Sequence, residues 1–198
     1  MPYDAAATRQ RLLQAAIAEF AALGLAGARV DRIAAAAKAN KRAIYDHFTN
    51  KEGLFDAAVE LVVGQLIDAV PLRETDLPGY VAELFDYLQA HPEAVRMLSW
   101  QRLERPQAGP RIADGFLDHL KSIRDRPQPG GQAHTIPAVD LIILMIGLAN
   151  AWHLSAPDLL ASLGQEPTNR RLIARHRASV IEAAQRINHP PSTPLSGH

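Results

Sequence analysis

The sequence is short of cysteine and of aromatic residues, and these shortages exclude several kinds of protein. None of its 198 residues is cysteine, and only 6% are aromatic. A chain without thiols forms no disulfide, has no cysteine nucleophile and holds no zinc ion or iron–sulfur cluster through thiolates. This composition fits a reducing, cytoplasmic setting.

Long apolar segments are missing too. The longest uninterrupted apolar run, Leu141 to Ala149, is far shorter than the ~20 residues that span a bilayer. Residues 1–4 also lack the basic stretch that precedes the apolar part of a secretory signal. We therefore expect a soluble protein without a membrane partner.

The chain has no excess of either charge, because 21 basic residues balance 21 acidic ones. This balance argues against a uniformly basic coat for nucleic acid. The charges are unevenly distributed, however. Up to Glu52 there are eight basic and five acidic residues, which gives +3 there and −3 in the rest of the chain. The sequence thus has a basic head and an acidic body.

Apolar residues recur at helical spacing almost throughout, and no alternating strands flank a hairpin turn, so we expect an all-α protein. Gly24 is expected to end the first helix, Pro92 to begin a later one, and Thr49 with Glu52 to form a capping box. The expected helices cover residues 8–23, 31–37, 40–48, 49–70, 77–90, 92–105, 111–126, 138–155 and 169–187.

The second and third helices have the spacing of a helix-turn-helix. Both are short, and a turn of about 3–4 residues separates them. Asn40 is a good N-cap for the second of the pair. Ile44 and Phe48 lie one turn apart on its apolar face, so the side chains expected to point away are Lys41, Arg42, Tyr45 and Asp46.

Basic residues occupy the first turns of two adjacent helices. Lys41 and Arg42 follow Asn40, and Lys51 follows Thr49. A cation at a helix N-terminus opposes the helix dipole, so stability alone does not favour these positions. Free N–H groups beside Lys or Arg do suit phosphate. Any one of these residues could simply be a solvated surface charge, but three together favour a DNA backbone.

The segment from Ala28 to Phe55 resembles the TetR-type transcriptional repressors. It reads ARVDRIAAAAKANKRAIYDHFTNKEGLF and follows LLQAAIAEFAALGLAG, residues 12–27. The resemblance is specific over this first quarter of the chain and covers only helix number and length beyond it. It implies a DNA-binding domain over 1–52, a connecting helix over 49–70 and an effector-binding and dimerisation domain over 71–188. The proline and glycine content of residues 189–198 separately predicts a disordered tail.

The resemblance also implies contacts with a double-stranded DNA operator. Lys41, Arg42 and Ala43 would approach base edges, and Lys51 would clamp the backbone. The other residues with implied phosphate or base contacts are Asn40, Tyr45 and His47. Two positions depart from the family: Lys38 stands where glycine is usual in the turn, and Arg29 where threonine usually caps the second helix. Lys38 would be strained if its φ were positive, and both residues could add a phosphate contact or be solvated.

The segment from Leu141 to Ala149 is apolar all round a helix, so nearly every side of it must be covered. A central position in one chain would achieve this, and so would a subunit interface. The resemblance implies the second arrangement, a four-helix bundle in a homodimer that reads a two-fold operator. The expected interface residues are Leu141, Leu144, Leu148, Trp152, Ile173, Val180, Ile181 and Ala184.

The body also carries bulky and soft side chains at helical spacing, which are more often plain core than a ligand site. The resemblance nevertheless implies an effector pocket, largely apolar, for an unknown small molecule. Its expected lining is Phe85, Leu88, Met97, Trp100, Glu104, Phe116, Leu120, Met145 and Trp152, with Trp100, Glu104, Asn150 and His153 as polar handles. A bound effector would tilt the fourth helix and change the spacing of the two reading heads.

Residues for catalysis are scarce. Asp114, Asp118 and His119 share one helix edge and His153 precedes Asp158, but such carboxylates are usually solvated. There is no glycine-rich phosphate loop and no H-E-x-x-H motif. We therefore expect a repressor with no catalytic residue, metal or cofactor. The alternative is a helical module for small molecules or protein partners that does not bind DNA.

Overall fold

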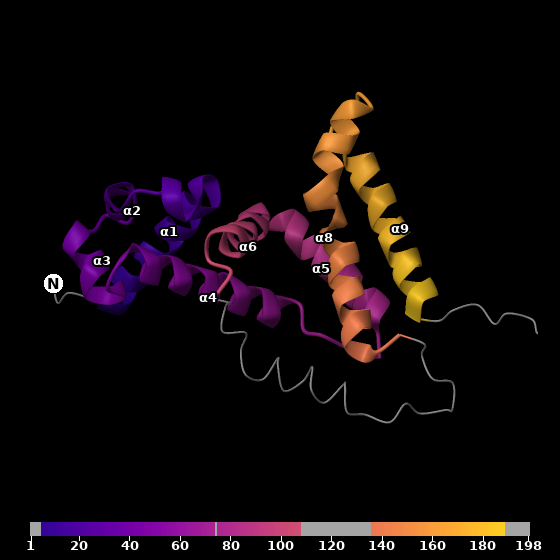
Figure 1. Ribbon diagram of the computed structural model, residues 1–198, viewed down its shortest axis with the longest axis horizontal. Helices are drawn as coiled ribbons and strands as arrows, with labels where there is room; N and C mark the ends of the chain where they lie inside the picture. Colours follow the sequence, from indigo (N-terminus) through magenta and orange to yellow (C-terminus); the bar gives the residue numbers. More distant parts are fainter. Residues whose placement is uncertain (1–4, 74, 108–135, 189–198) are drawn as a thin grey trace, which may run out of the picture. The chain divides into compact units, whose positions relative to one another are not determined.

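The computed structural model describes residues 5–73, 75–107 and 136–188 (Figure 1). Every regular element in these ranges is an α-helix, which confirms the all-α prediction. The helix expected over 111–126 and the tail over 189–198 lie outside the described residues, as do Asp114, Phe116, Asp118, His119 and Leu120.

The helices form two compact units, each described here by itself. Unit 1 comprises Met1–Ala69 with His91–Phe116, and unit 2 comprises Val70–Ala90 with Leu117–His198. The helices of unit 1 are α1 (Ala5–Gly27), α2 (Val30–Ala36), α3 (Lys41–Phe48), α4 (Lys51–Ala69) and α6 (Pro92–Glu104). Those of unit 2 are α5 (Leu77–Ala90), α8 (Ala138–Ser162) and α9 (Arg170–Asn188).

Helix α1 is the centre of unit 1, because α2, α3, α4 and α6 all pack on it. Its apolar stripe is buried as expected, and the rings of Phe20 and Phe55 meet edge to face with centroids 5.0 Å apart. This pair joins α1 to α4 at the middle of the core. The other fully buried large side chains of unit 1 are Leu12, Leu13, Ile33, Ile44, Leu54, Val59 and Met97.

Gly24 interrupts α1 as expected. Its φ of +69° is strained for any other residue, and helical hydrogen bonding resumes for one further turn to Gly27. A Cβ at this position would lie 2.9 Å from the ring of Trp100 on α6. Glycine is therefore required here both for the backbone conformation and for the close approach of α6.

The end of α6 is fastened to unit 1 by two charged side chains. The carboxylate of Glu104 accepts hydrogen bonds from the backbone N–H groups of Leu25 and Ala26. Arg105 donates to both carboxylate oxygens of Asp56 on α4, at 2.9 and 2.7 Å. We call these contacts the α6 clamp. It holds α6 with the helix-turn-helix although α5 intervenes in the sequence.

The junction between α3 and α4 differs from the expected capping box. Thr49 has φ +67° and ends α3, so its side chain does not cap α4. Asn50 does so instead, since its Oδ1 accepts from the N–H of Gly53 at 2.7 Å. A Cβ at Gly53 would lie 2.3 Å from the carbonyl oxygen of Phe48, which explains the glycine in this first turn.

Unit 2 is built from α5, α8 and α9, which pack against one another (Figure 1). Helix α8 continues to Ser162, beyond the expected end at residue 155, although Pro157 lies inside it. Leu160 is buried, so the last turns of α8 still pack on the core of unit 2. Gly164, with φ +66°, then ends the helix.

The α6 clamp predicts a measurable loss of stability. Glu104→Ala leaves two backbone N–H groups without their acceptor, which should lower the free energy of unfolding by about 1–3 kcal/mol. Urea unfolding followed by far-UV circular dichroism measures the change. Arg102→Ala, at an exposed position of the same turn, is the control. Equal effects of the two substitutions would show that the clamp does not hold α6.

Candidate nucleic-acid interface and ligand-binding unit

Helix α3 presents its polar side outward. Asn40 caps it, as predicted, by accepting from the N–H of Ala43 at 2.9 Å. Ile44 and Phe48 are buried against α1, α2 and α4, which fixes the rotation of the helix. The side chains that this rotation leaves exposed are Asn40, Lys41, Arg42, Tyr45 and Asp46.

One predicted contact residue does not face outward. Ala43 is only 5% exposed because it packs inside the helix-turn-helix, so it offers almost no surface to a base edge. The structure thus gives the expected contact of Ala43 with a base edge no support. Lys41 and Arg42, which precede it, remain accessible with side chains 50% and 86% exposed.

The two cations at the start of α3 have acidic neighbours. Lys41 lies 3.0 Å from Asp31 on α2, and their hydrogen bond raises the pKa of Lys41. Arg42 lies 3.9 Å from Asp46, one turn further along α3. Exposed ion pairs of this kind contribute little to stability, so phosphate or base groups can compete for either cation.

Three more of the predicted DNA-contact residues lie on α3 and at the start of α4. Tyr45 is 46% exposed and His47 is half-buried, with its ring 6.0 Å from that of Phe48. Lys51, in the first turn of α4, donates to the carbonyl oxygen of Ala26 at 3.4 Å. Lys51 thus lies beside the last turn of α1.

The turn before α3 is stabilised without glycine. Lys38 has φ +52°, and the bonds Lys38 N–H to Ala35 O and Ala39 N–H to Ala34 O, at 3.1 and 2.9 Å, form a Schellman motif. Lysine in this conformation costs about 1 kcal/mol relative to glycine. The strain anticipated at Lys38 is thus present.

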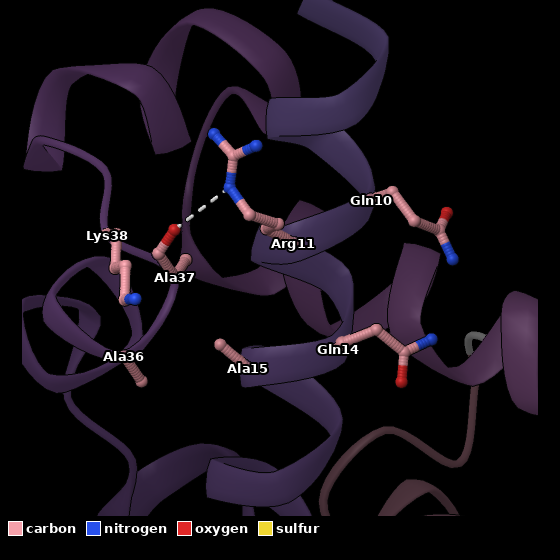
Figure 2. A pocket seen from close by; sticks show the side chains of 7 residues that line it. All are labelled: Gln10, Arg11, Gln14, Ala15, Ala36, Ala37 and Lys38. Carbon is pink, nitrogen blue, oxygen red and sulfur yellow. Dashed lines mark hydrogen bonds between the residues drawn. The ribbon is translucent and has the colours of Figure 1, made fainter.

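Arg11 supports this turn from α1. An open groove of about 400 Å³ lies between α1 and the end of α2, lined by Gln10, Arg11, Gln14, Ala15, Ala36, Ala37 and Lys38. Figure 2 shows the Nε of Arg11 donating across it to the carbonyl oxygen of Ala37, at 3.2 Å. Its Nη2 donates to Thr8, which fixes the guanidinium in place.

Arg29 precedes α2 but does not cap it with its side chain. The carboxylate of Glu19 on α1 holds this end of α2 in another way. It accepts from the backbone N–H of Arg29 at 2.9 Å and from Arg32 at 2.7 Å. The side chain of Arg29 is therefore not needed for the start of α2.

The residues expected to line an effector pocket divide between the units. Phe85, Leu88, Met145 and Trp152 are buried in unit 2. Met97, Trp100 and Glu104 belong to unit 1 because α6 packs on α1 and α4, and Glu104 is bonded in the α6 clamp. Among the other handles, the amide of Asn150 donates to Ile146 of its own helix.

Two histidines lie close together in unit 2, and the sequence predicted a role for one of them. His153 on α8 was an expected handle, and His176 on α9 was not. Phe85 contacts both rings, with centroid distances of 6.3 Å to His153 and 5.9 Å to His176. Burial lowers the pKa of both imidazoles, and the neighbouring charge of His176 further lowers that of His153. His176 is spaced three residues after Ile173 and four before Val180, so the sequence could have shown that it lies on the inner face of α9.

The expected dimer residues need a correction. Leu141, Trp152, Val180 and Ala184 are at most 8% exposed, because they form the core between α5, α8 and α9. Leu148, Ile173 and Ile181 are half-buried, and Leu144 is the one expected residue that is exposed, at 44%. Besides Leu144, helix α8 also exposes large apolar side chains at Val139, Ile143 and Leu154. We call these four residues the outer α8 face.

In the described ranges, no group of three or more His, Asp or Glu side chains could hold a metal ion. None of the helices described is long and apolar enough to cross a membrane.

Family models match both parts of the chain. One described as "Bacterial regulatory proteins, tetR family" matches residues 12–58. A second, "Tetracyclin repressor-like, C-terminal domain", matches residues 76–186.

Individual proteins are similar along most of the length. The HTH-type transcriptional repressor SCO4008 of Streptomyces coelicolor is 38% identical over 191 residues, covering 93% of this chain and 96% of the repressor. The HTH-type transcriptional repressor NicS of Pseudomonas putida is 33% identical over 105 residues, 50% of each chain. The crystal structure of the S. coelicolor regulator SCO4942 superposes with a TM-score of 0.76 at 33% identity, covering 91% of this chain and 97% of that one.

The histidine pair predicts acid sensitivity of unit 2. Because burial lowers the pKa of His153 and His176 below the ordinary 6.5, the unfolded chain binds protons that the folded chain does not. The free energy of unfolding should therefore be highest above about pH 7.5 and fall as the pH drops through 6.5. Urea unfolding at several pH values measures this slope.

The double substitution His153→Phe with His176→Phe should flatten that slope between about pH 7.5 and 5.5. His91→Gln, at an imidazole 45% exposed in unit 1, is the control. An unchanged slope in the double variant would assign the acid sensitivity to other groups.

Proposed function

Since this chain belongs to the TetR family and is a ligand-responsive, DNA-binding transcriptional regulator, we propose that unit 1 reads one half of a palindromic operator in a homodimer. The observation that carries this proposal is the exposed polar side of α3. It displays Lys41, Arg42 and Tyr45 from a rigidly capped helix, with Lys51 at the next helix N-terminus.

The contacts divide by reach. Arg42 has the most exposed side chain of the α3 ion pairs, at 86%, and takes the role of a base reader, because a guanidinium can donate two parallel bonds to guanine. Lys51, Asn40 and Tyr45 bind phosphates on either side of the groove. Lys41 leaves Asp31 for a phosphate or base, and Lys38, Arg29 and His47 add backbone contacts.

The homodimer uses the outer α8 face. Ile143, Leu144 and Leu154 are 61%, 44% and 58% exposed in the single chain, which is unusual for large apolar side chains on one helix. Gly147 lies among them with nothing within 4 Å of the place of a Cβ, so a second helix could approach closely. A two-fold pair formed there would carry two reading units toward half-sites about 34–36 Å apart.

The ligand acts on unit 2. A small, largely apolar effector binds among the helices of this unit and favours a dimer whose reading units no longer match the operator spacing, which releases a repressor from DNA. The protein has no catalytic role and acts in the cytoplasm, where its operator is. The alternative is a helical ligand-binding or interaction module without DNA binding, for which nothing in α3 would need to be basic.

Two substitutions separate reading from anchoring. Arg42→Ala should weaken binding to a selected genomic fragment by about 1–3 kcal/mol and leave random DNA nearly unaffected, because a base contact is lost. Lys51→Ala should weaken both equally and reduce the slope of log affinity against log salt by about 0.9, the share of one phosphate. Fluorescence anisotropy titrations at several salt concentrations measure both effects.

Arg96→Ala, at an exposed position on α6, is the control for loss of one positive charge. Equal losses on selected and random DNA for Arg42→Ala would refute its role as a base reader. Absence of any DNA fragment that the unmodified chain binds would favour the interaction module.

If the dimer forms through the outer α8 face, charged substitutions on that face should give a monomer. Ile143→Glu with Leu144→Glu places charges where a partner helix would pack, so sedimentation equilibrium should change from two chains to one. Leu103→Glu replaces a leucine that is 73% exposed in unit 1 and should leave the dimer intact. A dimer that survives the double substitution would exclude this face as the interface.

A further inference from the structure

Three buried nitrogen atoms in unit 2 have no hydrogen-bond partner. Within the described ranges, the buried side-chain nitrogens or oxygens without a partner are Nε2 of Gln89, Nε2 of His153 and Nε2 of His176. They come from three different helices, α5, α8 and α9. Buried polar atoms are normally paired, so three unpaired ones in a single small unit point to a missing partner.

The two imidazoles lie beside two aromatic rings. Phe85 lies within 6.3 Å of the His153 ring and 5.9 Å of the His176 ring. The Trp152 ring lies 5.0 Å from that of His176. Gln89 is one helical turn beyond Phe85 on α5, on the same side of that helix. The two imidazoles therefore border aromatic rings, and Gln89 lies on the side of α5 that carries Phe85.

Two other polar side chains of unit 2 bond to the backbone of their own helices. The amide of Asn150 donates to Ile146 O at 2.8 Å, and the hydroxyl of Ser179 donates to Arg175 O at 3.1 Å. Gln89, His153 and His176 make no such local bond, although an amide and an imidazole can each donate. The unpaired Nε2 atoms thus distinguish these three residues from Asn150 and Ser179.

A count of acceptor positions indicates the chemistry of the partner. Nε2 of Gln89, His153 and His176 are three donor atoms that can supply four N–H groups, two from the amide and one from each imidazole protonated at Nε2. A carbonyl oxygen accepts through two lone pairs, whereas a carboxylate accepts through about four. We propose that these residues form the polar end of the effector site and that the effector is an aromatic carboxylate. Its ring would lie against Phe85 and Trp152. This inference rests on the proposed function of unit 2 as the effector-binding unit.

The charges nearby permit an anion. Asp86 on α5 and Arg177 on α9 bond to each other twice, at 2.7 Å each, so the aspartate is neutralised by its partner. Glu83 likewise pairs with Arg73 at 2.8 Å. Both imidazoles can also take up a proton when an anion approaches, which strengthens their hydrogen bonds.

Three probes with the same ring test the proposal on the full-length chain: benzoate, benzamide and toluene. Titration calorimetry should show saturable binding of benzoate, about tenfold weaker binding of benzamide and no measurable binding of toluene, because each loses acceptors for the three donors. In two-dimensional NMR of the unmodified chain, benzoate should shift the imidazole resonances of His153 and His176. This second measurement needs no variant to fold.

Gln89→Leu and His176→Phe should each lower the affinity for benzoate about tenfold, whereas Gln185→Leu, at an exposed position of α9, should not change it. Benzoate that binds no better than benzamide, or that leaves the two imidazole resonances unmoved, would overturn the proposal. DNA binding of the same preparation is measured in parallel. If a genomic fragment binds while benzoate does not, this inference alone fails; if no fragment binds, the proposed function fails.

Discussion

The position of α6 depends on one carboxylate. Glu104 bonds to the two backbone N–H groups that follow Gly24, and it can reach them only because Gly24 leaves room for Trp100. This contact joins residues 92–104 to the compact unit that contains the helix-turn-helix. Ala26 and Glu104, which it connects, are 78 residues apart in the sequence. The unit that contains the helix-turn-helix therefore also contains a helix from the middle of the chain, which is bonded to the last turn of α1.

Strained backbone at both ends of α3 shows what holds the reading helix. Lys38 and Thr49 both have positive φ without being glycine, which costs roughly 1 kcal/mol each. Neighbouring side chains hold these conformations: Arg11 bonds to the carbonyl before Lys38, and Asn50 begins α4 immediately after Thr49. The orientation of α3 is thus fixed by polar contacts from α1 and α4 in addition to the buried Ile44 and Phe48.

Local patterns predicted much of this structure, and tertiary packing decided the rest. The spacing of Ile44 and Phe48 was sufficient for the exposed side of α3. Thr49 and Asn50 are both good N-cap residues, so the sequence does not show which one caps α4. In the structure Thr49 has a positive φ and ends α3, and Asn50 is the cap. An all-apolar helix such as α8 has no period from which its buried side can be found, which explains why Leu141 and Trp152 were expected at an interface. The clamp by Glu104 is a long-range contact without a local signal.

Charge pairing on α3 bears on how sequence discrimination arises. Lys41 and Arg42 already have Asp31 and Asp46 beside them, so a random phosphate that displaces a carboxylate exchanges one ion pair for another and leaves an aspartate facing the DNA. That aspartate repels the backbone. The repulsion is offset only where Arg42 can bond bidentately to a base or Asp46 can accept from a cytosine amino group. If α3 reads DNA as proposed, Asp31 and Asp46 would weaken nonspecific binding more than operator binding, which suits a chain whose total charge is zero.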